Sequence, residues 1–232
     1  MQIFYMIFSV SWKYQTRGEI EAPIVHDYDL GYIYVTAMNE LPEEDPNAHP
    51  GYDLYAISPE DGELVYVKEI HETVAFPPYK RQIKGEATLN ILTYNTGFLY
   101  QFDPEDGETD EEDMGEKGEY KAPSDGFPVF DNRDGILFFG YQTGGLAGIN
   151  TETYELDLED DLDGKLILTA MTLCSGQGAP DYEPFKDLYF GTQDEVVKYD
   201  VLAKEIVWVK SLKDIPALGA PVLDNWGQLL VG

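Results

Sequence analysis

The segment from Glu159 to Gly164 carries the residue types that bind a divalent metal ion. Its acidic side chains stand at alternate positions before a glycine, as in calcium loops whose residues 1, 3 and 5 converge on one ion. Glu159, Asp161 and Asp163 would be the ligands. Position 12 of such a loop is Ala170 instead of a bidentate glutamate, which excludes a helix–loop–helix calcium site. We therefore predict a calcium loop at a sheet edge, with a solvated hairpin turn as the alternative.

The other reactive side chains form no catalytic pattern. Cys174 is the only cysteine, which excludes an intramolecular disulfide and a thiolate metal cluster. Ser175 follows it, but the Gly-x-Ser-x-Gly phrase of a nucleophile elbow is missing. The three histidines lack partners at metal-ligand spacing and are interpreted as surface or turn residues: His26, His49 and His71. We expect no catalytic residue and no site for an organic cofactor, which leaves calcium as the one candidate ligand.

Tyrosine is unusually frequent, with seventeen copies in 232 residues. Sheets use most tyrosines for packing, so only those beside turns are candidates for contacts with a partner. Four meet this condition and are predicted surface contacts: Tyr28, Tyr52, Tyr141 and Tyr182.

The formal net charge is −29, from 44 acidic and 15 basic side chains. This charge repels phosphate backbones and anionic lipid surfaces, so nucleic-acid binding is excluded. It fits either a strongly solvated, salt-adapted surface or a surface that collects divalent cations. The first ten residues are apolar, but no basic residue precedes them and they are too short to span a bilayer. We interpret them as a strand, with no signal peptide visible, and predict no membrane span.

The elements that would position these residues recur along the chain. A small or apolar residue followed by proline opens each unit, at Pro23, Pro77, Pro128, Pro180 and Pro221. Apolar strands follow at 54–57, 99–102, 146–149 and 196–199, and another strand precedes each of them. A large apolar or aromatic residue marks the strand that closes each unit, at Trp12, Tyr66, Tyr120, Leu168 and Trp208. Repeats near this length are typical of propellers and solenoids.

Each unit therefore holds four short strands separated by Gly, Pro, Asn and Asp, as in a propeller blade. We predict one all-β domain over residues 1–232, a β-propeller of antiparallel four-stranded blades. The predicted blades cover approximately 17–70, 71–121, 122–170 and 171–213, with 214–232 and 1–16 forming a partial closing blade. The chain is then either a five-bladed ring or a fragment of a seven- or eight-bladed propeller. The acidic stretch 103–121 is predicted to be a mobile, extended loop.

The repeat resembles that of pyrroloquinoline-quinone-type propellers. The likeness lies in Leu54–Ile57, in the Asp61-Gly62-Glu63 turn and in the Gly219–Asn225 segment, and it extends over nearly the whole chain. In that family a quinone enzyme holds its cofactor in the central channel with a calcium ion, an aspartate base and a vicinal cysteine pair. Cys174 alone cannot supply the pair. The resemblance therefore implies the non-catalytic branch.

By this resemblance, we expect a rigid protein-binding or scaffold module that holds a protein partner or a surface polymer, in the periplasm or at the cell surface. The first alternative is a calcium-dependent extracellular adhesion module. The second is a remnant of a quinone-dependent dehydrogenase. The sequence leaves the oligomeric state open.

Overall fold

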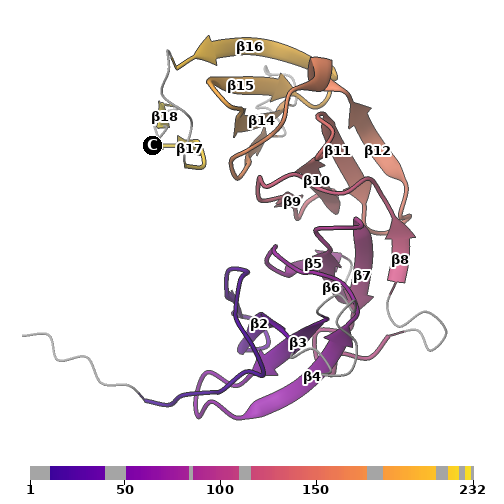
Figure 1. Cartoon of the computed structure of the whole chain (residues 1–232), viewed down its shortest axis with the longest axis vertical. Helices are drawn as coiled ribbons and strands as arrows, with labels where there is room; N and C mark the ends of the chain where they lie inside the picture. The colour runs from indigo at the N-terminus through magenta and orange to yellow at the C-terminus, as the bar shows by residue number, and fades with distance from the viewer. Residues whose placement is uncertain are drawn as a thin grey trace, which may run out of the picture.

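The computed structural model describes residues 11–39, 51–83, 86–109, 116–176, 185–212, 219–224 and 228–230. These residues form antiparallel sheets and a single short 3-10 helix, η1 (Leu162–Gly164). Figure 1 shows the sheets placed one after another along an arc, with one strand of each sheet on the convex rim. The predicted all-β propeller of four-stranded antiparallel blades is confirmed.

Four sheets have four strands each, hydrogen-bonded in chain order. Blade 1 contains β1 (Val25–Asp27), β2 (Tyr32–Met38), β3 (Tyr52–Ile57) and β4 (Leu64–Ile70). Blade 2 contains β5 (Tyr79–Ile83), β6 (Glu86–Leu92), β7 (Phe98–Phe102) and β8 (Glu116–Glu119). Blade 3 contains β9 (Val129–Asp131), β10 (Ile136–Gly140), β11 (Leu146–Asn150) and β12 (Leu156–Asp160). Blade 4 contains β13 (Thr172–Gly176), β14 (Phe185–Gly191), β15 (Glu195–Asp200) and β16 (Glu205–Ser211).

A two-stranded sheet of β17 (Val222–Leu223) and β18 (Leu229–Leu230) follows at the end of the arc (Figure 1). Residues 11–16 are not a strand and do not pair with it. They lie against blade 1 instead, where Trp12 and Tyr14 pack beside Val35 and Tyr55. The described residues therefore do not form the predicted closing blade, and residues 1–10 lie outside the described part of the chain.

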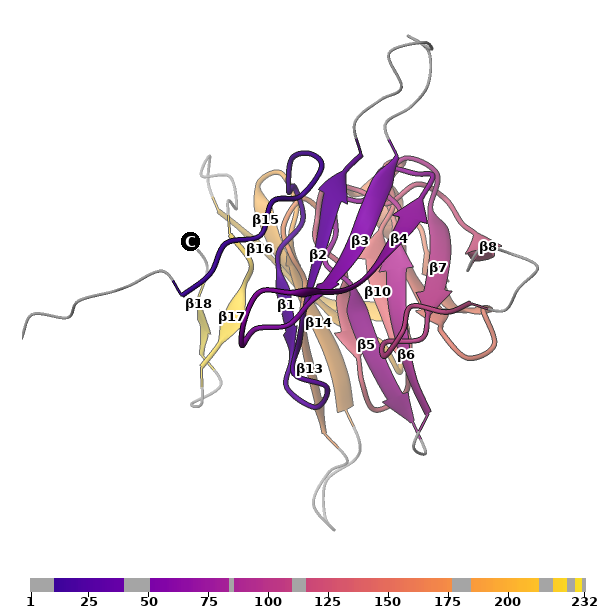
Figure 2. The ribbon, with the colours of Figure 1, turned by 90° about the horizontal axis from the view of Figure 1, so that it is seen from below.

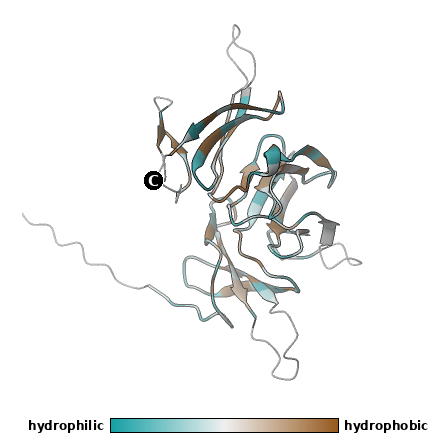
Figure 3. Ribbon diagram, turned by 45° about the horizontal axis from the view of Figure 1, so that its top comes forward, coloured by the Kyte–Doolittle hydropathy of each residue, from teal (hydrophilic) through white to brown (hydrophobic). Residues whose placement is uncertain are grey.

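The core lies between the sheets. All six residues of β3 are buried, whereas most residues of the outer strand β4 are partly or fully exposed. One apolar cluster joins blades 2, 3 and 4, through residues such as Leu92, Phe138 and Val197. Figure 3 shows that hydrophobic stretches of the ribbon lie within the strands. Each sheet thus buries its faces against its neighbours, which explains why central strands are apolar on both sides.

Three predictions about the boundaries of the blades and their loops are wrong. Leu168 does not close blade 3, because the outer strand is β12 and Leu168 follows η1 with 38% of its surface exposed. Pro180 does not open blade 4, because β13 begins earlier, at Thr172; Pro180 itself lies outside the described residues. The stretch 103–121 is not a single extended loop, since it begins with a tight turn and includes the strand β8.

The turn between the third and fourth strands has the same backbone in each blade. Its fifth residue adopts a left-handed conformation, with φ of +78° at Gly62, +71° at Gly107, +61° at Tyr154 and +55° at Lys204. In blade 1 the amide of Gly62 donates to the Ser58 carbonyl at 2.9 Å, and blades 2 and 3 repeat this bond. Figure 2 shows the strands of the blades running between two ends of the molecule, where the chain turns from one strand to the next. The turn geometry is thus retained where the sequence has lost the glycine.

Lys204 should therefore carry backbone strain that glycine would relieve. A left-handed conformation costs a non-glycine residue about 1–2 kcal/mol, so we expect Lys204→Gly to stabilise the fold relative to Lys204→Ala by about 1 kcal/mol. The alanine variant is the matched control, because both substitutions remove the bond of 3.1 Å from Lys204 Nζ to the Asp157 carbonyl. Urea unfolding measures the difference. An alanine variant as stable as the glycine variant would contradict the expectation.

Candidate binding site

Three adjoining cavities form one depression between blades 1 and 2. Their volumes are about 460, 390 and 330 Å³. The first two share Asp29, Lys80 and Gln82, and the last two share Ala87 and Asp103. We call this depression the acidic groove. Its walls are the β1–β2 turn of blade 1, the strands β5 and β6, and the β7–β8 turn of blade 2, and Asn132 of blade 3 borders one end.

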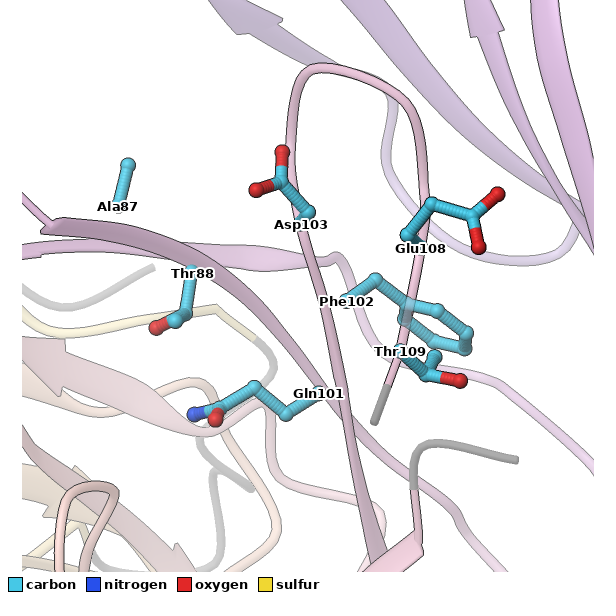
Figure 4. Close-up of a pocket in the computed structure, with 7 residues that line it drawn as sticks. All are labelled: Ala87, Thr88, Gln101, Phe102, Asp103, Glu108 and Thr109. Atoms are coloured by element: carbon cyan, nitrogen blue, oxygen red, sulfur yellow. The ribbon is translucent and has the colours of Figure 1, made fainter. Parts of the chain in front are cut away.

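Figure 4 shows the end of the acidic groove that lies in blade 2. Asp103 and Glu108 stand on the two sides of the β7–β8 turn, with Thr88 and Gln101 on the neighbouring strands. The turn is held by its own hydrogen bonds, since the amide of Glu105 donates to Asp103 Oδ1 at 2.7 Å. The amide of Gly107 donates to the Asp103 carbonyl at 2.9 Å. This end is therefore a preformed polar surface.

Lys80 fixes the other end of the groove by joining the two blades. Its ammonium lies 2.7 Å from Asp27 Oδ2, 2.8 Å from Asp27 Oδ1 and 3.2 Å from Asp29 Oδ2. Asp27 also accepts a hydrogen bond of 2.9 Å from the amide of Asp29, which shapes the β1–β2 turn. Burial alone would raise the pKa of Asp27, but Lys80 and the turn amides hold that pKa below its ordinary value. The carboxylate is thus charged at neutral pH.

The groove remains acidic although Lys80 is present. Its lining contains Asp27, Asp29, Asp103, Glu105 and Glu108, against a single lining cation among the described residues. Carboxylates on low-dielectric walls raise the local concentration of cationic ligands. Such a surface favours lysine and arginine side chains over anionic ligands.

One aromatic side chain stands at the rim of the groove. Tyr28 is 87% exposed, and its ring lies edge-on to His26 at 4.3 Å between ring centroids. An exposed tyrosine offers a rigid apolar surface and a cation–π partner. The prediction that Tyr28 is at the surface is therefore confirmed, while its role in contacts stays a prediction.

Two of the predicted surface tyrosines are buried, so these predictions are wrong. Tyr52 is 1% exposed because it begins the wholly buried strand β3, and its hydroxyl bonds to Glu21. Tyr141 is 2% exposed, directly after β10, and its hydroxyl lies 3.5 Å from Glu159 Oε1. Burial raises the pKa of both phenols, and the acidic neighbours add to the effect. Tyr182 lies outside the described residues.

The proposed calcium ligands all lie at the end of blade 3, but two of the three carboxylates have another partner. Glu159 Oε1 lies 2.6 Å from the ammonium of Lys121, and Asp161 Oδ1 accepts a bond of 3.1 Å from the Asp163 amide. In the part of the chain that the structure describes, no three His, Cys, Asp or Glu side chains form a group that could hold a metal ion. The geometry therefore fits the solvated turn, and the calcium loop stays a prediction.

The remaining candidates of the sequence are dispersed. His26 borders the acidic groove, His71 is exposed after β4, and His49 lies outside the described residues. Cys174 is only partly buried, and it faces Asp187 across the β13–β14 pair. Sequence reasoning misses the groove because its walls come from separate segments of two blades, mainly 25–34, 80–88 and 101–109, and no local motif unites them. Recurrent Asp-x-x-x-Gly turns are the available signal.

No protein-family model and no curated protein sequence matches this chain. Among solved structures, BamB from Moraxella catarrhalis is similar with a TM-score of 0.59 and 14% identity over 92% of this chain and 58% of that one. BBS1N, solved in complex with ARL6DN, is similar with a TM-score of 0.59 and 15% identity over 90% of this chain and 60% of that one. The quinohemoprotein alcohol dehydrogenase ADHIIG from Pseudomonas putida is similar with a TM-score of 0.50 and 13% identity over 87% of this chain and 36% of that one.

These similarities show the fold, which is that of a β-propeller, and they agree with the resemblance of the repeats to pyrroloquinoline-quinone-type propellers. The chain spans less than two thirds of the length of each of these neighbours. A search of the described residues for a helix with the length and apolarity of a bilayer span found none.

Removing Lys80 should destabilise the joint between blades 1 and 2. Lys80→Met leaves the buried Asp27 without its cation, so we expect a loss of about 3 kcal/mol at neutral pH. The pKa of Asp27 is depressed, so this stabilisation is present above the ordinary carboxyl value of 3.8 and is lost as the pH falls through the folded pKa. In the variant, burial without the cation raises the pKa of Asp27. The difference between wild type and variant should therefore be largest at neutral pH and shrink on acidification, first as Asp27 of the variant is protonated and then as Asp27 of the wild type is protonated.

Urea unfolding at several pH values measures this difference. Lys13→Met is the control, because Lys13 is exposed and lines none of the three cavities of the groove. A difference that grows on acidification would contradict the assignment of the effect to Asp27.

Calcium binding at Glu159, Asp161 and Asp163 has a direct thermal test. A bound ion raises the melting temperature by mass action, and the triple variant Glu159→Gln, Asp161→Asn, Asp163→Asn would abolish that rise. Because Lys121 forms an ion pair with Glu159 in the structure, we expect millimolar calcium to change the melting temperatures of the wild type and of the triple variant equally. A rise confined to the wild type would confirm the calcium loop.

Proposed function

We propose that this chain is a non-catalytic propeller that binds a protein partner through the acidic groove. The observation that carries the proposal is the groove itself, in which the turns of two blades and the inner strand β5 converge on one polar depression. Strands and tight turns hold these walls, so the partner meets a surface that is already formed. Preformed surfaces avoid the ordering cost of binding.

The charge of the groove points to a partner segment that carries lysine or arginine. The five carboxylates lie at the rim or in the walls, where they would steer a basic segment and fix its register. Tyr28 would then contact the apolar stem or the cation of a bound side chain. Support from known structures is at the level of fold, and it includes BBS1N in complex with ARL6DN.

The proposal of a non-catalytic role rests on the site residues, because the structural neighbours include both dehydrogenases and other proteins. Among the described residues the groove holds no histidine–carboxylate–nucleophile arrangement and no metal-binding group. Cys174, the sole cysteine, lies on β13 in blade 4 and lines none of the three cavities of the groove. Placement in the periplasm or at the cell surface stays part of the proposal.

Neutralising the groove should weaken binding of a basic peptide. The probe is a fluorescein-labelled nonapeptide of alternating lysine and serine, followed by fluorescence anisotropy at low and physiological salt. The test variant is Asp29→Asn, Asp103→Asn, Glu105→Gln, in which the amide oxygens preserve the turn hydrogen bonds. We expect its affinity to fall about tenfold or more and its salt dependence to decrease.

The control variant removes three exposed carboxylates outside the groove, through Glu155→Gln, Asp194→Asn and Glu205→Gln. It has the same net charge as the test variant, so it separates local contacts from overall attraction. Equal weakening by both variants would show that the peptide responds only to the net charge, and the groove would then not be the binding site.

A further inference from the structure

Strand β5 is the inner edge of blade 2. Its sheet runs in the order β5-β6-β7-β8, so β5 pairs with β6 on one side alone. In the part of the chain that the structure describes, no backbone hydrogen bond joins β5 to a strand other than β6. Figure 1 shows β5 on the concave side of the arc, away from the rim strand β8. Alternate residues of an edge strand point their amide and carbonyl groups away from the sheet, so β5 presents such groups for pairing.

The first cavity of the acidic groove lies along this edge. Its lining includes Val25 of blade 1, Lys80 and Gln82 of β5, and Asn132 of blade 3. Because blade 2 stands between blades 1 and 3 (Figure 1), a cavity that reaches both neighbours and Lys80 passes the inner edge of blade 2. Its volume is about 460 Å³, and the adjoining cavity, which shares Lys80 and Gln82, adds about 390 Å³. The free edge of β5 therefore faces open space that belongs to the groove.

Both faces of β5 are fixed by the neighbouring blades. On the blade 1 side, the ammonium of Lys80 lies 2.7 Å from Asp27 Oδ2. On the blade 3 side, the guanidinium of Arg81 lies 2.8 Å from Glu152 Oε2. The strand is thus held extended before a partner binds, which lowers the ordering cost of adding a further strand to it.

β5 also offers a longer edge than the inner strands of the two adjacent blades. It has five residues, whereas β1 and β9 have three each. Five residues leave about two or three with backbone groups that point away from β6. The inner strand of blade 4, β13, has five residues but lines none of the three cavities of the groove. Among the inner strands of the four blades, β5 therefore combines the longer edge with the acidic walls.

The alternation of side chains along β5 sets which face of an added strand would meet the carboxylates. Lys80 and Gln82 line the groove, whereas Arg81 between them pairs with blade 3. A strand added beside β5 continues the same sheet, so every second side chain of that strand would face the same side as Lys80 and Gln82. The carboxylates of Asp29 and Asp103 line the groove on this side. An extended segment with a basic residue at every second position therefore matches both the edge and the charge.

We propose that the basic segment of the partner binds as an extended strand, hydrogen-bonded to the free edge of β5, with alternate side chains directed at the carboxylates of the acidic groove. This inference rests on the proposed function and specifies the conformation of the bound segment. Backbone pairing supplies affinity, and the alternating side chains supply specificity. An α-helical basic segment would leave the edge of β5 unpaired, because its own backbone groups are bonded internally.

Backbone N-methylation tests the pairing with the full chain. The probe is the labelled lysine–serine nonapeptide, prepared in two further forms that carry equal numbers of N-methyl groups, on lysines or on serines. In an extended strand all lysine amides point to one side and all serine amides to the other. We expect methylation of the amides that face β5 to weaken binding about tenfold or more, and methylation of the others to change the affinity less than about threefold.

The two methylated peptides are matched controls for each other, because they have the same charge and the same number of blocked amides. The ratio of their affinities should not depend on salt, whereas each affinity should fall as salt is added. Amide hydrogen exchange gives a second measurement on the protein itself. Saturating parent peptide should slow exchange at alternate residues of β5 and leave the rim strand β12 unchanged.

Equal affinities of the two methylated peptides, whether both tight or both weak, would overturn the added strand. In that case a loss of parent-peptide binding in the variant Asp29→Asn, Asp103→Asn, Glu105→Gln would still support the proposed function. Unchanged exchange in β5 at saturating peptide would also overturn the added strand alone. If the parent peptide does not bind the wild-type chain, both the proposed function and this inference are wrong.

Discussion

A four-stranded sheet with apolar residues on both faces is stable only when other sheets cover those faces, and this requirement governs the whole molecule. Strand β3, for example, is buried at every residue although its blade has only four strands. The cover comes from the neighbouring blade, through residues such as Leu89 and Tyr100 that share one apolar cluster with Leu54. The contacts between blades are therefore what folds the chain, and every site lies on elements that these contacts hold in place.

A net charge of −29 opposes this packing, because neighbouring blades carry the same sign. The few cations counteract the repulsion by lying at the joints. Ion pairs cross from blade to blade at Lys68–Glu108, Lys80–Asp27, Arg81–Glu152, Lys121–Glu159, Lys165–Glu195 and Lys186–Asp131. Those with buried carboxylates, such as Asp27 and Asp131, are costly to break, since the remaining charge would lie uncompensated. The placement of the cations therefore explains how so acidic a chain forms one compact arc.

The sequence is sufficient to predict the blades because their inner strands carry local apolar signals, but it fails where the signal depends on neighbouring blades. Strand β12 reads Leu-Asp-Leu-Glu-Asp, which resembles a polar loop, so the apolar Leu166–Leu168 run looks like the closing strand in its place. Tyr52 and Tyr141 lie near turns, which predicts exposure. Both side chains are nevertheless buried, and the hydroxyl of each lies beside a glutamate. The acidic groove cannot be predicted for the same reason, since its walls meet only after two blades have packed.

The β7–β8 turn shows how packing and recognition depend on one another. One side of it lies under Tyr66 of blade 1, whose ring leaves no room for a Cβ on Gly107. Its other side presents Asp103 and Glu105 to the groove. Tyr34, also from blade 1, donates a second bond of 2.9 Å to the Pro104 carbonyl, so two side chains of one blade fix this turn of the next. The carboxylates of the groove are consequently held at fixed positions by the same contact that joins the blades. Binding of a partner to them therefore depends on the packing of blade 1 against blade 2.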